Sequence, residues 1–272
     1  MNPALLALST EFEAPTTHDF SRWFEDGAWM LGPWEIGPFE IGLNFIYLLV
    51  LMAMASFLAF FYFAFRKPKV VPGKLQLVAE MGMDFVKQNT VLPMIGPQGL
   101  GYFALLATLF FYILAGNIYE IIPGFNFSMN SRLAFPVVLA LVAYVAYHTA
   151  GIRRHGFGGY LKHSLILPGV PLALMPLMIV IEIVQVFITR PLTLSVRLFA
   201  NMVAGHFLLS VFFLGTIGLM FSGKPLLMVF SPFSAAMAVV LVGFELFVAG
   251  LQAFIFAVLT ASYIGTAMSE EH

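Results

Sequence analysis

The stretch that decides the fold is PLTLSVRLFANMVAGH, residues 191–206. It places Arg197, Asn201 and His206 inside an apolar run that extends from about residue 170 to residue 221. At 1.5 Å per residue, a helix over that run would be roughly 75 Å long, more than twice the thickness of a membrane core. The helix must therefore tilt steeply or break. Pro191 is the position at which a broken pair of helices would separate.

The composition of the whole chain is that of an integral membrane protein. Hydrophobic residues make up 60% and charged residues 10% of its 272 residues, against roughly 45–50% and about 25% in soluble proteins. A net charge of −1 argues against a nucleic-acid partner, which would require a surplus of Lys and Arg. With no cysteine, the sequence offers no disulfide and no thiolate metal site.

The fold class predicted is an all-α membrane protein with about five crossings and one interfacial amphipathic helix. Residues 41–272 form a single membrane domain, and the acidic, tryptophan-containing residues 1–40 form an N-terminal segment outside the membrane. The amphipathic segment 74–89 is too short and too charged to span, so we expect it at the interface. The expected crossings are 41–65, 100–122, 133–151, 168–221 and 226–268.

Basic residues set the expected orientation. Arg66, Lys67, Lys69 and Lys74 form one cluster, and the loop after the third crossing, GIRRHGFGGYLKH at 151–163, forms another. Two crossings separate these clusters, so both lie on one side, which the positive-inside rule makes cytoplasmic. The N-terminus is then outside and the C-terminus is cytoplasmic.

The last two crossings are predicted to form a long, tilted antiparallel hairpin. Residues at equal height in such a hairpin have numbers whose mean falls at the turn. The pair Arg197 and Gln252 averages 224.5, and the pair His206 and Glu245 averages 225.5, both at the SGKP turn. The polar residues thus form two layers, an Arg/Gln layer deep in the hairpin and a His/Glu layer about 13 Å nearer the turn.

These residue types point to ion chemistry inside the membrane. A buried arginine costs at least about 2.5–3.5 kcal/mol and faces protein or water. Because it keeps its proton, Arg197 cannot relay one, but it can hold a carboxylate ionised and block a proton leak. His206 and Glu245 can gain and lose protons through water. The alternatives are a structural ion pair for Arg197 and a structural hydrogen-bond pair for His206 and Glu245.

Four stretches carry a family resemblance. The sequence RLFANMVAGH at 197–206, FELFVAGLQAFIFAVLT at 244–260, NIYEIIP at 117–123 and the GFGGY loop at 156–160 are similar to subunit a of bacterial F-type ATP synthases. The resemblance covers most of the chain from residue 41 onward. In some bacterial members an acid stands in place of His206 and a histidine in place of Glu245. Because the register puts the two side by side, we expect the exchange to preserve function.

The resemblance implies a stationary proton channel with two aqueous half-channels beside a rotating c-ring. Arg197, supported by Gln252, would face the ring carboxylates. The expected half-channel open to the outside is lined by Asn117, Glu120, Asn201, His206 and Glu245. Glu182, with Arg190 and Ser195, is expected toward the cytoplasmic half-channel, although Glu182 could simply pair with Arg190. Implied partners are the c-ring, the peripheral-stalk b subunits and the lipid of a bacterial plasma membrane.

Other functional classes fit the sequence less well. A secondary transporter would show two similar halves, and five crossings divide poorly into inverted repeats. A structural anchor would not need an arginine within the membrane. The sequence contains no Walker-type glycine loop, no HExxH and no GxSxG, so we expect no catalytic site, no metal and no cofactor.

Overall fold

The structure, a computed structural model, describes residues 31–36, 39–43, 45–122, 132–165, 171 and 174–269. Its elements in chain order are the strands β1 (Leu31–Ile36) and β2 (Phe39–Leu43), the helices α3 (Phe45–Phe65) and α4 (Lys74–Val86), a π-helical turn (Lys87–Val91), α5 (Leu92–Met94), a 3-10 helix (Pro97–Tyr102), α6 (Phe103–Ile121), α7 (Ala134–Leu165), α8 (Met175–Val184), a second π-helical turn (Gln185–Thr189), α9 (Arg190–Met220), α10 (Pro225–Met228) and α11 (Ser231–Met268).

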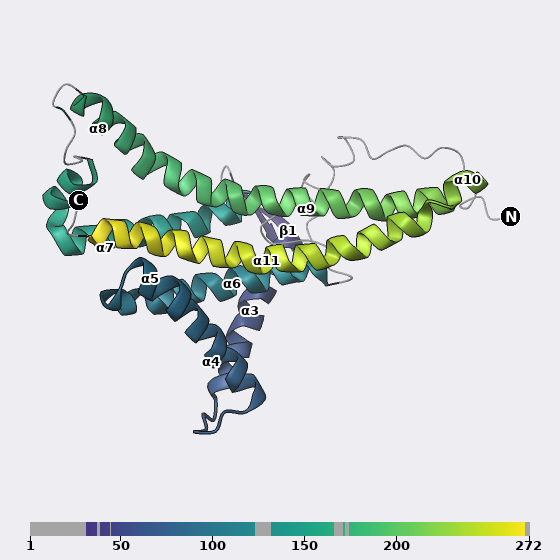
Figure 1. Cartoon of the computed structure of the whole chain (residues 1–272), viewed down its shortest axis with the longest axis horizontal. Coiled ribbons are helices and arrows are strands. Elements are labelled where there is room, and N and C mark those ends of the chain that lie inside the picture. The colour runs from purple at the N-terminus through teal and green to yellow at the C-terminus, as the bar shows by residue number, and fades with distance from the viewer. Residues whose placement is uncertain are drawn as a thin grey trace.

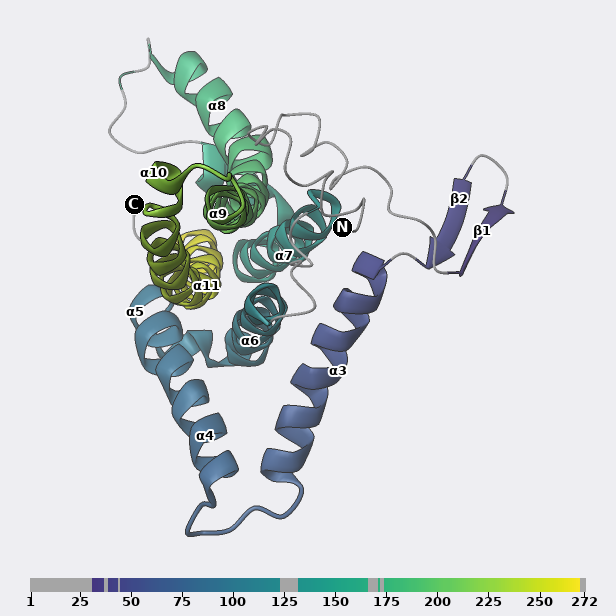
Figure 2. The same ribbon diagram turned by 90° about the vertical axis from the view of Figure 1, so that its right-hand side faces the viewer.

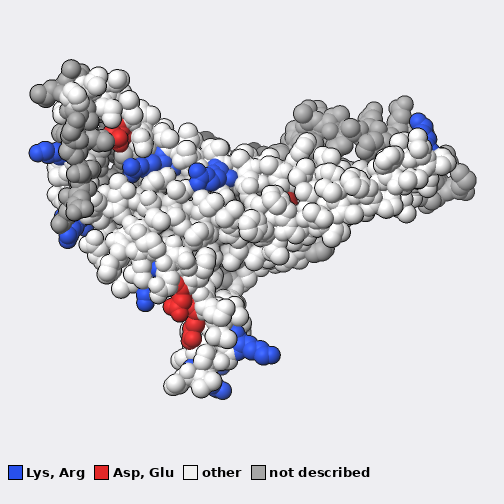
Figure 3. Space-filling model, viewed as in Figure 1, with Lys and Arg blue, Asp and Glu red and all other residues white. Residues whose placement is uncertain are grey.

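The predicted fold class is confirmed. Five helical segments among the described residues are long and apolar enough to cross a membrane: Leu48–Phe65, Pro97–Tyr119, Ala134–Leu165, Met175–Met220 and Pro225–Met268. In the last two, α9 and α11 run side by side in opposite directions along the longest axis of the molecule, and α8 angles away from α11 (Figure 1). Charged side chains are scarce over the part of this hairpin that approaches α10 (Figure 3). The chain is therefore a multi-pass membrane protein.

The helix that contains Pro191 is continuous, so the alternative of a broken pair of helices is wrong. Helical structure runs without interruption from α8 through the π-helical turn Gln185–Thr189 into α9. The π turn stands immediately before Arg190 and Pro191, where the missing N–H of proline disturbs the regular bonding pattern. A local change of helix type thus accommodates the proline without a break.

Two serine side chains show the register of the α9–α11 hairpin. The Ser231 hydroxyl donates to the Thr216 carbonyl at 3.0 Å, and the Ser234 hydroxyl donates to the Phe212 carbonyl at 3.0 Å. The means of these pairs are 223.5 and 223, within three residues of the values obtained from the sequence for the polar layers. The two helices are therefore antiparallel about the predicted turn.

Helix α11 forms the centre of the bundle and packs against α6, α7 and α9. Ala249, Ala253, Ala257 and Ala261 recur every four residues on one face, and all four are buried. Such small side chains let helix backbones approach closely. Most buried residues of α11 lie between positions 249 and 267, whereas only Ser231, Ser234 and Ala238 are buried nearer the turn. The bundle thus supports one half of the hairpin more than the other.

Helices α3 and α4 form an arm that diverges from the bundle, with the loop between them at its tip (Figure 2). The side chain of Gln76 closes this loop, because its amide accepts from the Lys69 N–H and donates to the Lys69 carbonyl, both at 3.1 Å. The amphipathic helix expected at 74–89 is thus present as α4 and the turn that follows. Its position at a membrane interface stays a prediction.

Two features differ from the sequence-based expectation. The segment expected as a basic loop after residue 151 is helical to Leu165, with one interruption at Gly156, whose φ of 72° suits glycine. Strands β1 and β2 pair as a short antiparallel hairpin before α3, where no regular structure was expected. The first thirty residues of the predicted outside segment lie outside the described residues.

Candidate functional site

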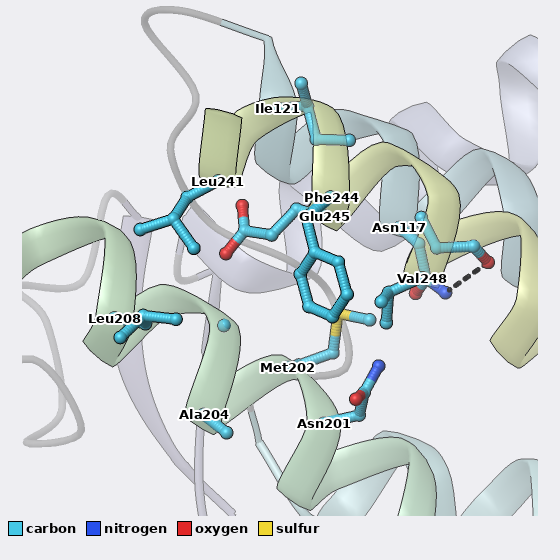
Figure 4. Close-up of a pocket in the computed structure, with 12 residues that line it drawn as sticks. Asn117, Ile121, Asn201, Met202, Ala204, Leu208, Leu241, Phe244, Glu245 and Val248 are labelled. Atoms are coloured by element: carbon cyan, nitrogen blue, oxygen red, sulfur yellow. Dashed lines mark hydrogen bonds between the residues drawn. The ribbon is translucent and has the colours of Figure 1, made fainter. Parts of the chain in front are cut away.

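A cavity lies where α6, α9 and α11 meet, within the membrane-spanning part of the hairpin (Figure 4). Its volume is about 130 Å³, enough for several water molecules at about 30 Å³ each. Most of its wall is apolar, and three polar side chains from three different helices line it. These are Asn117 of α6, Asn201 of α9 and Glu245 of α11.

Glu245 is the charged group of this cavity. Both of its carboxylate oxygens are buried, and neither has a hydrogen-bond partner among the described residues. Its carboxylate lies against Gly205, where an added Cβ would be only 2.7 Å from Oε1. Gly205 therefore provides the space that Glu245 occupies. A buried carboxylate requires a partner, so this side chain is placed to bind water or a proton.

The two asparagines line the cavity away from the Glu245 carboxylate, which points toward Leu241 (Figure 4). Asn117 is buried, and its Nδ2 donates to the Ala249 carbonyl of α11 at 3.3 Å (Figure 4). The Nδ2 of Asn201 is buried without a hydrogen-bond partner in the described part of the chain. Figure 4 shows the Asn201 side chain directed from α9 toward Val248 of α11. Asn201 thus brings an unused donor to the cavity, and Glu245 brings unused acceptors.

His206 lies next to the cavity without lining it. It is half-buried on α9 and follows Gly205, the residue in contact with Glu245. The Ser210 hydroxyl donates to the His206 carbonyl at 2.7 Å and lies 3.5 Å from Nδ1 of the imidazole. The structure thus places His206 at the height of Glu245, as the hairpin register predicts.

Arg197 and Gln252 differ in environment. Arg197 is exposed on α9, whereas Gln252 is buried on α11. Because the Glu245 carboxylate has no hydrogen-bond partner among the described residues, Arg197 does not pair with it. An exposed arginine halfway along a membrane helix needs a polar partner on that surface.

A second hollow lies at the other end of α9. It is an open groove of about 580 Å³ between α8, the π turn, the start of α9 and the end of α11. Arg190 contributes its charge, and its guanidinium lies 5.0 Å from the centre of the Tyr263 ring. The other polar lining residues are Gln185, Thr189, Thr193, Ser262 and Thr266.

Glu182 and Ser195 do not line either hollow. Glu182 is half-buried on α8, next to the groove residue Ile181. Ser195 is buried in α9 and donates to the Leu192 carbonyl at 2.9 Å. Glu120 falls in the last turn of α6, and its side chain lies outside the described part of the structure.

Most polar residues of the groove were missed by the sequence analysis. Thr189 with Thr193, and Ser262 with Thr266, are spaced four residues apart and so share a helix face. That spacing could have identified two polar stripes. The packing of one stripe opposite the other depends on how the start of α9 lies against α11, which the sequence pattern does not contain.

Comparison with known proteins agrees with the resemblance found in the sequence. Residues 45–265 match the family model described as ATP synthase A chain. The chain is 40% identical over 265 residues to ATP synthase subunit a of Rhodococcus erythropolis, covering 96% of this chain and 93% of that protein. It is 42% identical over 232 residues to the subunit a of Streptomyces lividans, covering 83% and 79%. It is 41% identical over 230 residues to that of Gluconobacter oxydans, covering 82% and 87%.

Proposed function

The chain belongs to the family of ATP synthase subunit a, and from this premise we propose that it is the stationary proton-channel subunit of a rotary ATP synthase. In this proposal it supplies two aqueous half-channels and an essential arginine, and it contributes no catalytic site of its own. Proton flow through it turns a ring of c subunits. The observation that carries the proposal is an exposed arginine, Arg197, on the helix that also borders a buried, unpartnered carboxylate.

The cavity around Glu245 is proposed as the half-channel open to the outside. Its polar lining groups, Asn117, Asn201 and Glu245, can hold a short chain of water, with Glu245 as the group that binds and releases the proton. His206 lies one residue beyond Gly205 and can exchange protons with the same water. Glu120, at the end of α6, stands toward the entrance in this proposal.

The ring is proposed to pass the face of the hairpin that carries Arg197. In the view along the bundle, α6 and α7 lie on one side of α9 and α11, and the opposite side of the hairpin is open (Figure 2). Exposed residues of α11 on the outer surface include Val239, Val240, Phe244 and Phe247. A ring carboxylate that reaches Arg197 on such an apolar surface would be held ionised by the guanidinium.

The groove at Arg190 is proposed as the half-channel to the cytoplasm. Hydroxyl and amide groups line it, it is open, and its nearest lining residue on α9, Thr193, is about one helical turn from Arg197. Glu182 stands beside it. Water in this groove would accept the proton from a ring carboxylate that has nearly completed a rotation.

The mechanism follows from the separation of the two paths. A proton that enters past Glu245 neutralises a ring carboxylate held by Arg197, and the neutral site can then move into lipid. After nearly a full turn the carboxyl loses its proton to the groove. Arg197, which cannot lose its own proton, prevents a direct leak between the paths. The membrane potential contributes about 2.3 kcal/mol per charge per 100 mV.

The assembly and orientation complete the proposal. We infer that the N-terminus is outside and the C-terminus is cytoplasmic, in a bacterial plasma membrane. The basic residues at the tip of the α3–α4 arm, Arg66, Lys67, Lys69 and Lys74, then lie in the cytoplasm. There they could contact the b subunits of the peripheral stalk.

The test replaces Arg197 with alanine. We expect ATP-driven proton uptake by membrane vesicles to be abolished, while the c-ring still co-purifies with the chain. The matched control is Lys224→Ala, because Lys224 is also an exposed base, located in the turn before α10, and its loss should leave pumping intact. Normal pumping by an assembled Arg197→Ala complex would contradict the proposal.

A further inference from the structure

The π-helical turn between α8 and α9 departs from α-helical hydrogen bonding. In it the N–H of Arg190 donates to the carbonyl of Gln185, five residues earlier. An α-helical register would instead direct that N–H to the carbonyl of Val186. The next residue, Pro191, has no N–H to donate.

Proline therefore leaves one carbonyl without a donor in either register. In an α register the unpaired carbonyl would be that of Phe187, four residues before Pro191. In the observed π turn the Val186 carbonyl has no backbone donor, because the Arg190 N–H donates to Gln185 and Pro191, five residues after Val186, has no N–H. A buried carbonyl without a donor is costly, so whatever satisfies one of these two groups selects the register.

Tyr147 of α7 satisfies the carbonyl left over by the π register. Its hydroxyl donates to the Val186 carbonyl at 2.8 Å. Tyr147 is 0% exposed and Val186 is 2% exposed, so no solvent competes for this bond. The rings of Tyr144, His148 and Tyr263 surround the Tyr147 ring at centroid distances of 5.4, 4.5 and 5.8 Å and hold it in place.

The register of the turn determines which face of α8 lines the groove. A π turn contains one residue more than an α turn, so a change to the α register rotates one flank by about 100° relative to the other. Helix α9 is packed on α7 and α11, whereas α8 has no buried residue. A change of register would therefore rotate α8 and leave α9 in place.

Rotation of α8 would move each of its residues to the place of the preceding one. Glu182 would take the place of Ile181 and enter the groove, and Val184 would leave it for the place of Ile183. We propose that Tyr147 is a positioning residue that fixes the π register and thereby keeps Glu182 out of the groove beside Arg190. Its effect on pumping rests on the proposed function, but its effect on the register does not.

The test uses Tyr147→Phe, which removes only the hydroxyl. Single cysteines at positions 181, 182 and 184 of this cysteine-free chain are treated, in the assembled complex in vesicles, with a small water-soluble thiol reagent. With Tyr147, we expect Ile181→Cys and Val184→Cys to react and Glu182→Cys to be protected. With Tyr147→Phe, reaction at position 182 should rise and at position 184 fall, each by about tenfold, the effect of one buried hydrogen bond.

Position 181 is the matched control, because it lines the groove in both registers. An unchanged pattern in Tyr147→Phe would overturn the proposal. A uniform rise at all three positions would also overturn it, since that indicates loosening rather than rotation. Pumping is recorded in parallel, so a failure of the proposed function is distinguished from a failure of this inference.

Deletion of Ile188 provides an independent test. Ile188 lies in the π turn and is exposed. When Ile188 is deleted, an α turn holds α8 in the same rotational position in which the π turn holds it in the parental chain. We expect the deletion alone to keep the parental labelling pattern, and the deletion combined with Tyr147→Phe to restore it. If Tyr147→Phe alone does not assemble, the combined variant must do so, and failure to assemble or to restore the pattern would contradict the proposal.

Discussion

At the scale of the residue, the cavity depends on the pairing of a glycine with a carboxylate. Gly205 leaves room for Glu245 to lie across the interface of α9 and α11, and no protein group among the described residues neutralises that carboxylate.

A change of Glu245 to glutamine tests the role of its charge. The amide has nearly the same shape, so packing against Gly205 and assembly with the ring should be retained. Because the amide cannot carry a proton, we expect ATP-driven proton uptake to fall by roughly a hundredfold, within the range attributed to a positioned acid or base. Asp84→Asn, on the exposed side of α4, is the control. Uptake near the parental rate in Glu245→Gln would exclude Glu245 from the proton path.

At the scale of the element, hydrophobic pattern and length predicted where the helices lie, but they did not predict the irregularities within those helices. The apolar runs predicted five long helices, and the positions of Arg197, His206, Glu245 and Gln252 predicted the hairpin register, because both depend on regular helix geometry. The π turn before Pro191 was missed, because the sequence shows the missing N–H but not the Tyr147 hydroxyl that compensates for it.

The same turn type recurs earlier in the chain. The π turn Lys87–Val91 precedes Pro93 by the same offset at which Gln185–Thr189 precedes Pro191. In both, the residue just before the proline donates to a carbonyl five residues earlier, Leu92 to Lys87 and Arg190 to Gln185. A proline within a long helical segment is therefore a reason to expect a π turn in this chain as well as a break.

The alanine face of α11 gives a prediction about packing. Ala257 is fully buried, so a leucine there must displace neighbouring side chains of the bundle, at a cost of about 1–3 kcal/mol. We expect Ala257→Leu to reduce the fraction of chain that stays soluble in detergent after heating. Val240→Leu, on the exposed face of the same helix, should not change that fraction. Equal losses in both variants would refute a special role for the alanine face.

At the scale of the whole molecule, the ends of the bundle differ in charge as the positive-inside rule requires. The end of α7 carries Arg153, Arg154 and Lys162, and it lies at the end of the bundle opposite to α10 (Figure 1). The orientation of the chain depends on this asymmetry.

Cysteine labelling measures the orientation directly. Because the chain has no cysteine, Lys224→Cys and Lys162→Cys each provide one reactive site. We expect a membrane-impermeant maleimide to label position 224 in intact spheroplasts and position 162 only in inverted vesicles. The reverse pattern would invert the orientation and, with it, the assignment of the two half-channels to the two sides of the membrane.

The uneven support of the hairpin has a mechanical consequence. Helix α11 is embedded in the bundle between positions 249 and 267, whereas toward the turn it is held mainly by the bonds of Ser231 and Ser234 to α9. A sideways force on the hairpin therefore acts on a helix that is held firmly at one end and weakly at the other. We therefore expect the half of α11 that contains Gln252 to stay stiff and bending to be concentrated in the half that contains Glu245.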